Sequence, residues 1–179
     1  ARRFPSAPAV IYGDLRWTYG QLHQIVNRLA AALATMGIEP GDRVLLTLPN
    51  CPEYISSFLA VQKLGAVVVN AGPLMGSDDL GQLIALTRPR LAISLDLHGP
   101  ILDRACEGHP NINWLWVSLK NYQTIWKRMG YRVKLWQSAK HAVEPAREAS
   151  FDELLATASS RPPTVAPDPH DLAVLQPTG

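Results

Sequence analysis

The final residues of the sequence are the first candidates for chemistry. An apolar, strand-like run over residues 171–175 leads through a Gln-Pro pair into Thr178 and Gly179. A glycine- and threonine-rich loop after a buried strand can bind phosphate oxygens through its backbone amides and hydroxyl groups. We therefore predict a buried strand here and take Thr178 and Gly179 as candidate phosphate-binding residues. The alternative is an ordinary turn after the last strand.

A nucleophile or an acid–base pair would be the next kind of site, and Cys51 is the first residue to consider. It lies at the start of an expected helix, where the helix dipole lowers the pKa of a thiol and makes it reactive. The alternative, favoured because no base is nearby in the sequence, is a small buried residue.

Two pairs of adjacent carboxylates fall in the first turns of expected helices, where their charge stabilises the helix dipole: Asp78 with Asp79, and Asp152 with Glu153. We expect no catalytic residue among these groups.

Residue types that bind metals are sparse. The five histidines include no pair separated by four residues, as two ligands on one helix face would be. Two cysteines are too few for a four-cysteine zinc site or for a disulfide framework. We expect no metal ligand among the residues of this sequence.

The composition is that of an ordinary globular protein. Of the 179 residues, 47% are hydrophobic and 18% are charged, and the formal net charge is +2. No apolar stretch approaches the ~20 residues that cross a bilayer, and the first residues do not resemble a signal peptide. These features exclude a transmembrane protein, a secreted mini-protein and a collagen. We expect a fragment of a cytoplasmic protein.

One segment differs in charge from the rest of the chain. Residues 119–142 contain six basic residues and no acidic one. On a helix, Tyr122, Trp126 and Trp136 share one face, whereas Arg132 and the other basic residues lie elsewhere around the axis. This amphipathic pattern is typical of a helix lying on a membrane surface. The alternatives are a helix whose apolar face covers the sheet and a helix that binds a calmodulin-like partner. A single basic segment argues against nucleic-acid binding, which normally uses a broad basic face.

The hydrophobic periodicity alternates between two and 3.6 residues, which indicates alternating strands and helices. Thr18 and Gln21 have the spacing of a capping box at the start of the first helix. Residues 161–170 include four prolines and predict an extended connector. We predict an α/β fold with a doubly wound, largely parallel sheet flanked by helices. The expected strands are 9–12, 15–17, 44–48, 66–70, 91–95 and 114–117, and the expected helices are 19–36, 52–63, 77–87, 100–107 and 151–158.

Four blocks in this order resemble the N-terminal part of the adenylate-forming acyl-CoA synthetase superfamily. They are 17–22 (Trp-Thr-Tyr-Gly-Gln-Leu), 41–54 with its Gly-Asp-Arg-Val and Asn-x-x-Glu elements, 63–74 with Lys-Leu-Gly-Ala and Pro-Leu, and 171–179. The last block is similar to the strand that enters the family's Thr-Gly-Gly-Thr-Thr-Gly phosphate loop. The basic, aromatic stretch between these motifs resembles that of bacterial long-chain fatty-acid–CoA ligases.

The sequence also departs from the pattern of those ligases. An Ala-Gly pair at 71–72 replaces the more usual Thr-Asn, and Met-Gly-Ser at 75–77 replaces a typical Tyr-Thr-Pro. Pro177 stands where an aromatic residue is common. These departures concern the substrate class rather than the fold.

The resemblance implies an ATP-dependent, AMP-forming long-chain fatty-acid–CoA ligase. Such an enzyme uses ATP and Mg²⁺ to convert a fatty acid into an acyl-adenylate and pyrophosphate, and coenzyme A then displaces AMP. Residues 1–179 would be a partial N-terminal adenylation domain that ends inside the phosphate loop, whose partner is the remainder of the same chain. Only Thr178 and Gly179 of the expected site lie in it, so we expect this fragment alone to be inactive. The alternatives are an aryl or short-chain acid–CoA ligase of the same superfamily and a non-catalytic, lipid-docking α/β module.

Overall fold

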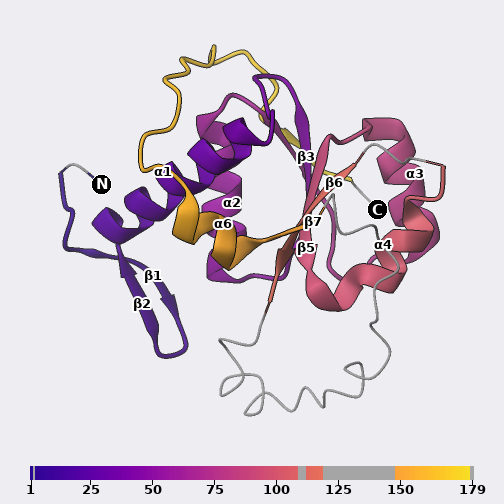
Figure 1. The fold of residues 1–179 in the computed structure, drawn as a ribbon, viewed down its shortest axis with the longest axis horizontal. Coiled ribbons are helices and arrows are strands. Elements are labelled where there is room, and N and C mark those ends of the chain that lie inside the picture. The colour runs from indigo at the N-terminus through magenta and orange to yellow at the C-terminus, as the bar shows by residue number, and fades with distance from the viewer. Residues whose placement is uncertain (2, 109–111, 119–147, 178–179) are drawn as a thin grey trace.

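The computed structural model describes residues 1, 3–108, 112–118 and 148–177 (Figure 1). The order of strands and helices follows the predicted alternation over most of the chain. The elements are β1 (Pro8–Tyr12), β2 (Leu15–Thr18), α1 (Tyr19–Thr35), β3 (Arg43–Thr47), α2 (Pro52–Lys63), β4 (Val67–Asn70), α3 (Ser77–Thr87), β5 (Leu91–Leu95), η1 (Asp96–His98), α4 (Gly99–Ala105), β6 (Asn113–Val117), β7 (Glu148–Ser150), α6 (Phe151–Thr157) and β8 (Val174–Leu175).

A six-stranded sheet with the order β7-β6-β5-β3-β4-β8 forms the centre of the fold. Every neighbouring pair in it runs parallel. The first two strands form a separate antiparallel hairpin that precedes α1. The predicted α/β fold with a parallel sheet is therefore confirmed.

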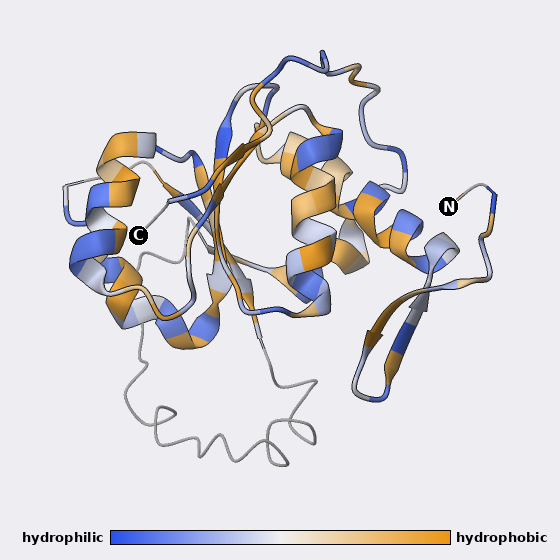
Figure 2. Ribbon diagram, turned by 180° about the vertical axis from the view of Figure 1, so that it is seen from behind, coloured by the Kyte–Doolittle hydropathy of each residue, from blue (hydrophilic) through white to orange (hydrophobic). Residues whose placement is uncertain are grey.

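Helices cover both faces of this sheet. Helices α1, α2 and α6 lie on one face, and α3 and α4 lie on the other (Figure 1). The central strands are apolar on both sides, because successive side chains point to opposite faces. Val44 and Leu46 pack towards the α1–α2 face, whereas Leu45 between them packs towards α3 and α4. Figure 2 shows the same division, with hydrophobic central strands and helices whose outer surfaces are largely hydrophilic.

Local sequence signals explain how the two helices beside the central strands begin. The Thr18 side chain accepts a hydrogen bond from the Gln21 backbone N–H, and the Gln21 side chain accepts one from the Thr18 N–H. The predicted capping box at the start of α1 is thus confirmed. Helix α2 starts with Pro52 at its first position, where no backbone N–H is needed for the helix.

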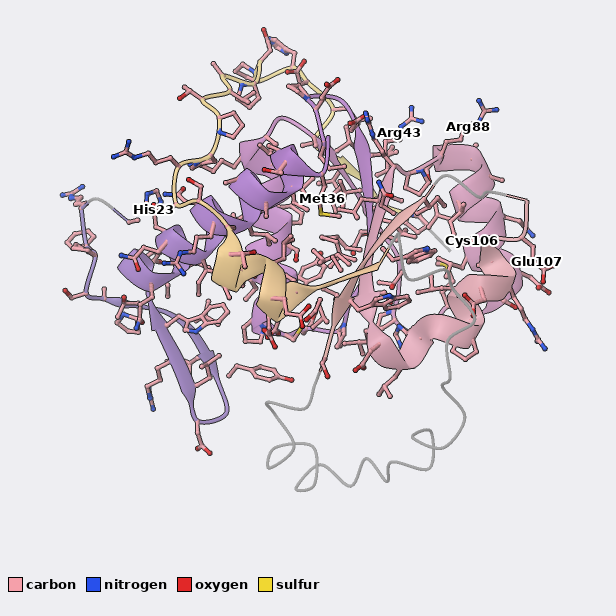
Figure 3. All side chains as sticks on the ribbon, in the orientation of Figure 1. His23, Met36, Arg43, Arg88, Cys106 and Glu107 are labelled. Carbon is pink, nitrogen blue, oxygen red and sulfur yellow. The ribbon has the colours of Figure 1, made fainter. Side chains whose placement is uncertain are left out.

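The amino-terminal edge of the sheet carries several basic side chains, among which Arg43 and Arg88 are labelled in Figure 3. Arg43 begins β3, and its Nη1 donates a hydrogen bond of 2.7 Å to the carbonyl oxygen of Thr87 at the end of α3. Arg90 forms a salt bridge of 3.1 Å with Asp42 at the same edge. The first contact joins the end of α3 to β3, and the second joins the segments that precede β5 and β3. The opposite, carboxyl-terminal edge is where ligands bind in doubly wound folds.

Two features differ from the predictions. Strand β7 was not predicted, because its three residues, Glu-Ala-Ser, form no apolar run. The run over 171–175 was expected to be a buried strand, but β8 has only two residues and both are half-buried. The reason is its position at the end of the sheet, where β4 is its neighbour on one side. The expected connector, 161–170, runs between α6 and β8 without helix or strand and packs Val165 and Pro167 against Gly65.

Candidate functional site

The carboxyl-terminal edge of the parallel sheet contains the point where the strand order reverses. From β3 the chain passes through α2 to β4 on one side, and it then returns through α3 to β5 on the other side of β3. In doubly wound folds, ligands bind outside the carboxyl ends of the strands at such a point. Three of these strands end in, or close to, polar side chains: Thr47 in β3, Asn70 in β4 and Ser94 in β5.

A buried hydrogen bond joins the ends of β3 and β5, and a partly buried contact continues it to His98. The Thr47 hydroxyl donates to the Ser94 hydroxyl oxygen at 2.5 Å, and the Ser94 oxygen lies 3.3 Å from Nδ1 of His98. The pKa of His98 is lowered because burial disfavours the charged ring, although a hydrogen bond with the Thr47 backbone and the charge of Asp96 partly oppose this. The Ser94–His98 contact joins the short helix η1 to the end of β5.

A small cavity lies beside this cluster, under the loop that follows β4. Its lining includes Thr47 and His98 as polar groups, and otherwise it is mostly apolar, with Met75, Leu80 and Ile101 among the lining residues. A neutral, hydrogen-bonded imidazole and a hydroxyl can orient a polar group here. The chemistry that they offer is positioning rather than nucleophilic attack, because the Thr47 hydroxyl is almost fully buried and donates its proton to Ser94.

A second set of polar contacts holds β8, with one contact near each end of the strand. Nε2 of Gln62 in α2 donates to the carbonyl oxygen of Ala173 at 2.7 Å. Nδ2 of Asn70 donates to Oε1 of Gln176 at 2.6 Å. Because β8 runs parallel to β4, its carboxyl end lies at the same edge as that of β4. Gln176, which follows β8, therefore lies at the carboxyl edge of the sheet.

The predicted phosphate-binding residues, Thr178 and Gly179, lie outside the described residues. The two residues that precede them, Gln176 and Pro177, are described and are exposed. The predicted amphipathic segment 119–142 also lies outside the described residues, together with the side chains proposed to contact a membrane, Tyr122, Trp126, Arg132 and Trp136.

Cys51 is not a reactive thiol. Its side chain is 2% exposed, and burial together with the neighbouring Glu53 raises its pKa to about 12. The same two residues, after burial itself, contribute to a raised pKa of Tyr12 in the hairpin. The structure thus supports the alternative of a small buried residue. Burial and the charge of Asp103 likewise raise the pKa of Cys106 to about 12.

The carboxylate pairs lie where they were expected. Asp78 and Asp79 are in the first turn of α3, and Asp152 and Glu153 are in the first turn of α6. All four side chains are exposed. Their position fits the helix-dipole interpretation rather than acid–base chemistry.

Sequence reasoning did not single out the polar residues that the structure brings to the carboxyl edge of the sheet and to β8. Thr47, Asn70 and Ser94 each interrupt an otherwise apolar strand near its carboxyl end, and this interruption was the available signal. Gln62 and His98 gave no comparable signal, because each lies in or beside a helix whose pattern was otherwise ordinary.

The part of the chain that the structure describes contains no group of three His, Cys, Asp or Glu side chains placed to bind a metal ion. Within the same residues, no helix has both the length and the apolar character required to cross a bilayer.

Comparisons with known proteins give a consistent result. The sequence matches the family described as "AMP-binding enzyme" over residues 1–179. It is 29% identical to a long-chain-fatty-acid–CoA ligase of Bacillus subtilis over 188 aligned residues, which cover 100% of this chain and 32% of that protein. It is 30% identical to a 4-coumarate–CoA ligase of Vanilla planifolia over 108 residues, covering 59% of this chain and 20% of the ligase.

The fold is similar to that of solved structures. The apo structure of MbtA from Mycobacterium smegmatis superposes with a TM-score of 0.76 at 27% identity, over 98% of this chain and 29% of that one. The chain therefore spans about a third or less of each of these three proteins.

Proposed function

The chain belongs to the AMP-binding enzyme family, and from this premise we propose that it is the N-terminal part of an ATP-dependent, AMP-forming long-chain fatty-acid–CoA ligase. In the first step, an oxygen of the fatty-acid carboxylate attacks the α-phosphorus of ATP, and pyrophosphate leaves. In the second step, the thiol of coenzyme A attacks the carbonyl carbon of the acyl-adenylate, loses its proton, and AMP leaves. The products are acyl-CoA, AMP and pyrophosphate.

The observation that carries this proposal is the position of β8. The strand lies beside β4, runs parallel to it, and ends at the carboxyl edge of the sheet close to the reversal of strand order. A loop that leaves a strand at this place is well situated to present backbone amides to an oxyanion. We assign the first phosphate contacts to Thr178 and Gly179, which follow β8 in the sequence.

The remaining contacts of ATP, Mg²⁺ and coenzyme A are assigned to other parts of the protein. The described residues hold no cluster of three acidic or other metal-binding side chains. No Mg²⁺ ligand is assigned among them, and no step of the reaction is attributed to a metal bound by them. The contribution of this region is the β8 framework from which the phosphate-binding residues extend.

Two features support a long-chain fatty acid as the substrate. The alignment with the Bacillus ligase extends over the whole of this chain. The basic, aromatic segment 119–142 also has the composition of a helix that lies on a membrane, where fatty acids concentrate. The similarity to a 4-coumarate–CoA ligase supports an aryl acid as the alternative substrate class.

Acid-dependent exchange of labelled pyrophosphate into ATP tests this function in the protein expressed from the complete coding sequence. Palmitate, 4-coumarate and acetate are compared as substrates. We expect palmitate to give the fastest exchange, and Thr178→Ala to slow it by about tenfold or more because a phosphate donor is lost. Thr164→Ala, at an exposed position of the connector, is the matched control and leaves the rate unchanged. Faster exchange with 4-coumarate than with palmitate would show that the substrate is an aryl acid and not a long-chain fatty acid. No exchange with any acid would refute the function.

Membrane contact through Tyr122, Trp126, Arg132 and Trp136 is a separate part of the proposal. Co-sedimentation with vesicles of anionic phospholipid tests it. We expect binding to the vesicles, and we expect Trp126→Ala combined with Trp136→Ala to abolish it, whereas Leu86→Ala, at an exposed apolar residue of α3, does not. If the wild-type protein stays in the supernatant, the segment is not a membrane-binding one.

A further inference from the structure

Strand β8 is weakly held by its backbone. The strand has only two residues, and they pair with β4 in the register Val68↔Val174 and Val69↔Leu175. One further backbone bond, from the N–H of Val68 to the carbonyl oxygen of Ala173 at 3.0 Å, precedes these pairs. Such a short strand at the end of a sheet has little backbone pairing to fix the direction in which it leaves the sheet.

The Gln62 side chain adds a contact at the amino end of β8. Its Nε2 donates to the Ala173 carbonyl oxygen at 2.7 Å, so this oxygen accepts both from the side chain and from the backbone of Val68. Gln62 lies in the last turn of α2, which packs directly on β4. The contact therefore ties β8 to the helix as well as to the neighbouring strand.

The Asn70 side chain adds a contact at the carboxyl end. Its Nδ2 donates to Oε1 of Gln176 at 2.6 Å. Asn70 is itself held firmly, because it pairs with Leu46 of β3, and the next N–H, of Ala71, donates to the Leu46 carbonyl oxygen at 3.0 Å. The Asn70 side chain, whose backbone is fixed in the sheet, therefore restrains the position of Gln176, the residue that follows β8.

Pro177 limits the backbone hydrogen bonds that could hold the chain after Gln176, so the Asn70–Gln176 bond has a larger share in holding it. A proline has no backbone N–H and cannot extend the pairing of β8 with β4. It also restricts the preceding residue, Gln176, to an extended backbone. Among the described residues, the Asn70–Gln176 bond is the last side-chain hydrogen bond to the chain before Thr178.

We propose that Gln62 and Asn70 are positioning residues that hold β8 and so fix the placement of the phosphate-binding residues that begin at Thr178. They contact β8 and Gln176 rather than the substrate. This inference rests on the proposed function, because it assigns these residues to ATP binding. Preorganised phosphate donors lose much of their effect when they are displaced by about 1 Å. Loss of either contact therefore weakens the use of ATP.

The test uses isosteric variants of the protein expressed from the complete coding sequence. Gln62→Met removes the contact with Ala173, and Asn70→Leu and Gln176→Met each remove the contact at the carboxyl end. The double variant Asn70→Leu/Gln176→Met completes a thermodynamic cycle. Gln82→Met, at an exposed amide of α3, is the matched control.

We expect each single variant to raise the KM for ATP by about three- to tenfold, the range of one hydrogen bond. The KM for the acid stays within about twofold, because the acid does not bind to the phosphate donors. The double variant resembles Asn70→Leu alone, since both changes remove the same bond. The Gln82→Met variant has wild-type constants. A purely structural role would instead lower all activity in parallel with the melting temperature, and that pattern would overturn the proposal.

Amide hydrogen exchange gives a second measurement that does not depend on catalysis. We expect Gln62→Met and Asn70→Leu to speed exchange in the peptide containing residues 173–176, with no change in β3. Unchanged exchange in this peptide would overturn the claim that these side chains hold β8.

An active wild-type protein whose variants keep the wild-type KM for ATP would overturn the link to ATP. If the wild-type protein shows no acid-dependent pyrophosphate exchange, the proposed function fails, and hydrogen exchange still decides whether the two residues hold the strand.

Discussion

Strands β3 and β8 reach the same edge of one sheet, but they are held in different ways. β3 pairs with β4 on one side and with β5 on the other, through four register pairs each. Its residues Val44, Leu45 and Leu46 are fully buried. β8 has two register pairs with β4, its two residues are half-buried, and the Gln62 and Asn70 amides supplement its backbone bonds.

The difference separates the residues that make the fold stable from those that position a ligand. Burial of apolar surface on both faces of β3 contributes directly to the free energy of unfolding. The amide contacts of β8 lie at an exposed position, where one hydrogen bond adds little net stability. Substitutions at the centre should therefore change the free energy of unfolding, whereas substitutions around β8 should mainly change the binding of ligands.

The largest effect is expected at the centre of the sheet. Leu46→Ala should lower the free energy of unfolding by about 2–5 kcal/mol, because it removes a fully buried side chain and leaves a cavity. Leu86→Ala is the control, since Leu86 is 81% exposed, and its effect should stay within about 0.5 kcal/mol. Urea denaturation measures both values. Equal effects of the two substitutions would contradict the assignment of the core.

A smaller but clear effect is expected from the hydroxyl cluster beside β3. Ser94→Ala leaves the buried Thr47 hydroxyl without its acceptor and should lower the free energy of unfolding by about 1–3 kcal/mol. Ser57→Ala is a matched control, because Ser57 is also fully buried and its Oγ has no hydrogen-bond partner among the described residues. It should be neutral or slightly stabilising. If both variants lose the same stability in urea denaturation, the Thr47–Ser94 bond is not the cause.

The contrast also explains what the sequence could predict. The apolar runs of β3 to β6 and the Thr18 capping box are local patterns, and the structure confirms them. The contacts of β8 are not local, since Gln62 lies 111 positions from Ala173 and Asn70 lies 106 positions from Gln176. Which strand becomes the neighbour of β4 is decided by the arrangement of the whole sheet. The family resemblance predicts a phosphate loop after β8, but it gives no indication of the contacts that Gln62 and Asn70 make with this strand.

The pH dependence of the free energy of unfolding tests the environment of His98, which lies beside Ser94 at the end of β5. Because burial lowers the pKa of His98 below its ordinary value of 6.5, the unfolded chain binds more protons than the folded one between these two pKa values. The free energy of unfolding should therefore fall as the pH decreases below about 6.5 and stop falling from this cause below the folded pKa.

His98→Gln removes this contribution, so the slope for the variant should be flatter than that for the wild-type protein over the same pH interval. Urea denaturation at a series of pH values measures the two slopes, and their difference excludes the carboxylates common to both proteins. Parallel slopes would show that His98 titrates alike in the folded and unfolded states.

The smallest effect is expected in β8 itself, where one pair of register partners offers a direct comparison. Val68 and Val174 face each other across β4 and β8, but Val68 is fully buried and Val174 is half-buried. Val68→Ala should lower the free energy of unfolding by about 2–3 kcal/mol, whereas Val174→Ala should lower it by about 1 kcal/mol or less.

The same substitution at two paired positions removes differences in side-chain chemistry and leaves burial as the variable. If Val174→Ala proves as destabilising as Val68→Ala in urea denaturation, β8 contributes to the core as fully as a central strand. Its direction would then be set by packing, and the amide contacts of Gln62 and Asn70 would be secondary. A small effect of Val174→Ala would instead leave these two side chains as the main determinants of where the chain leaves the sheet.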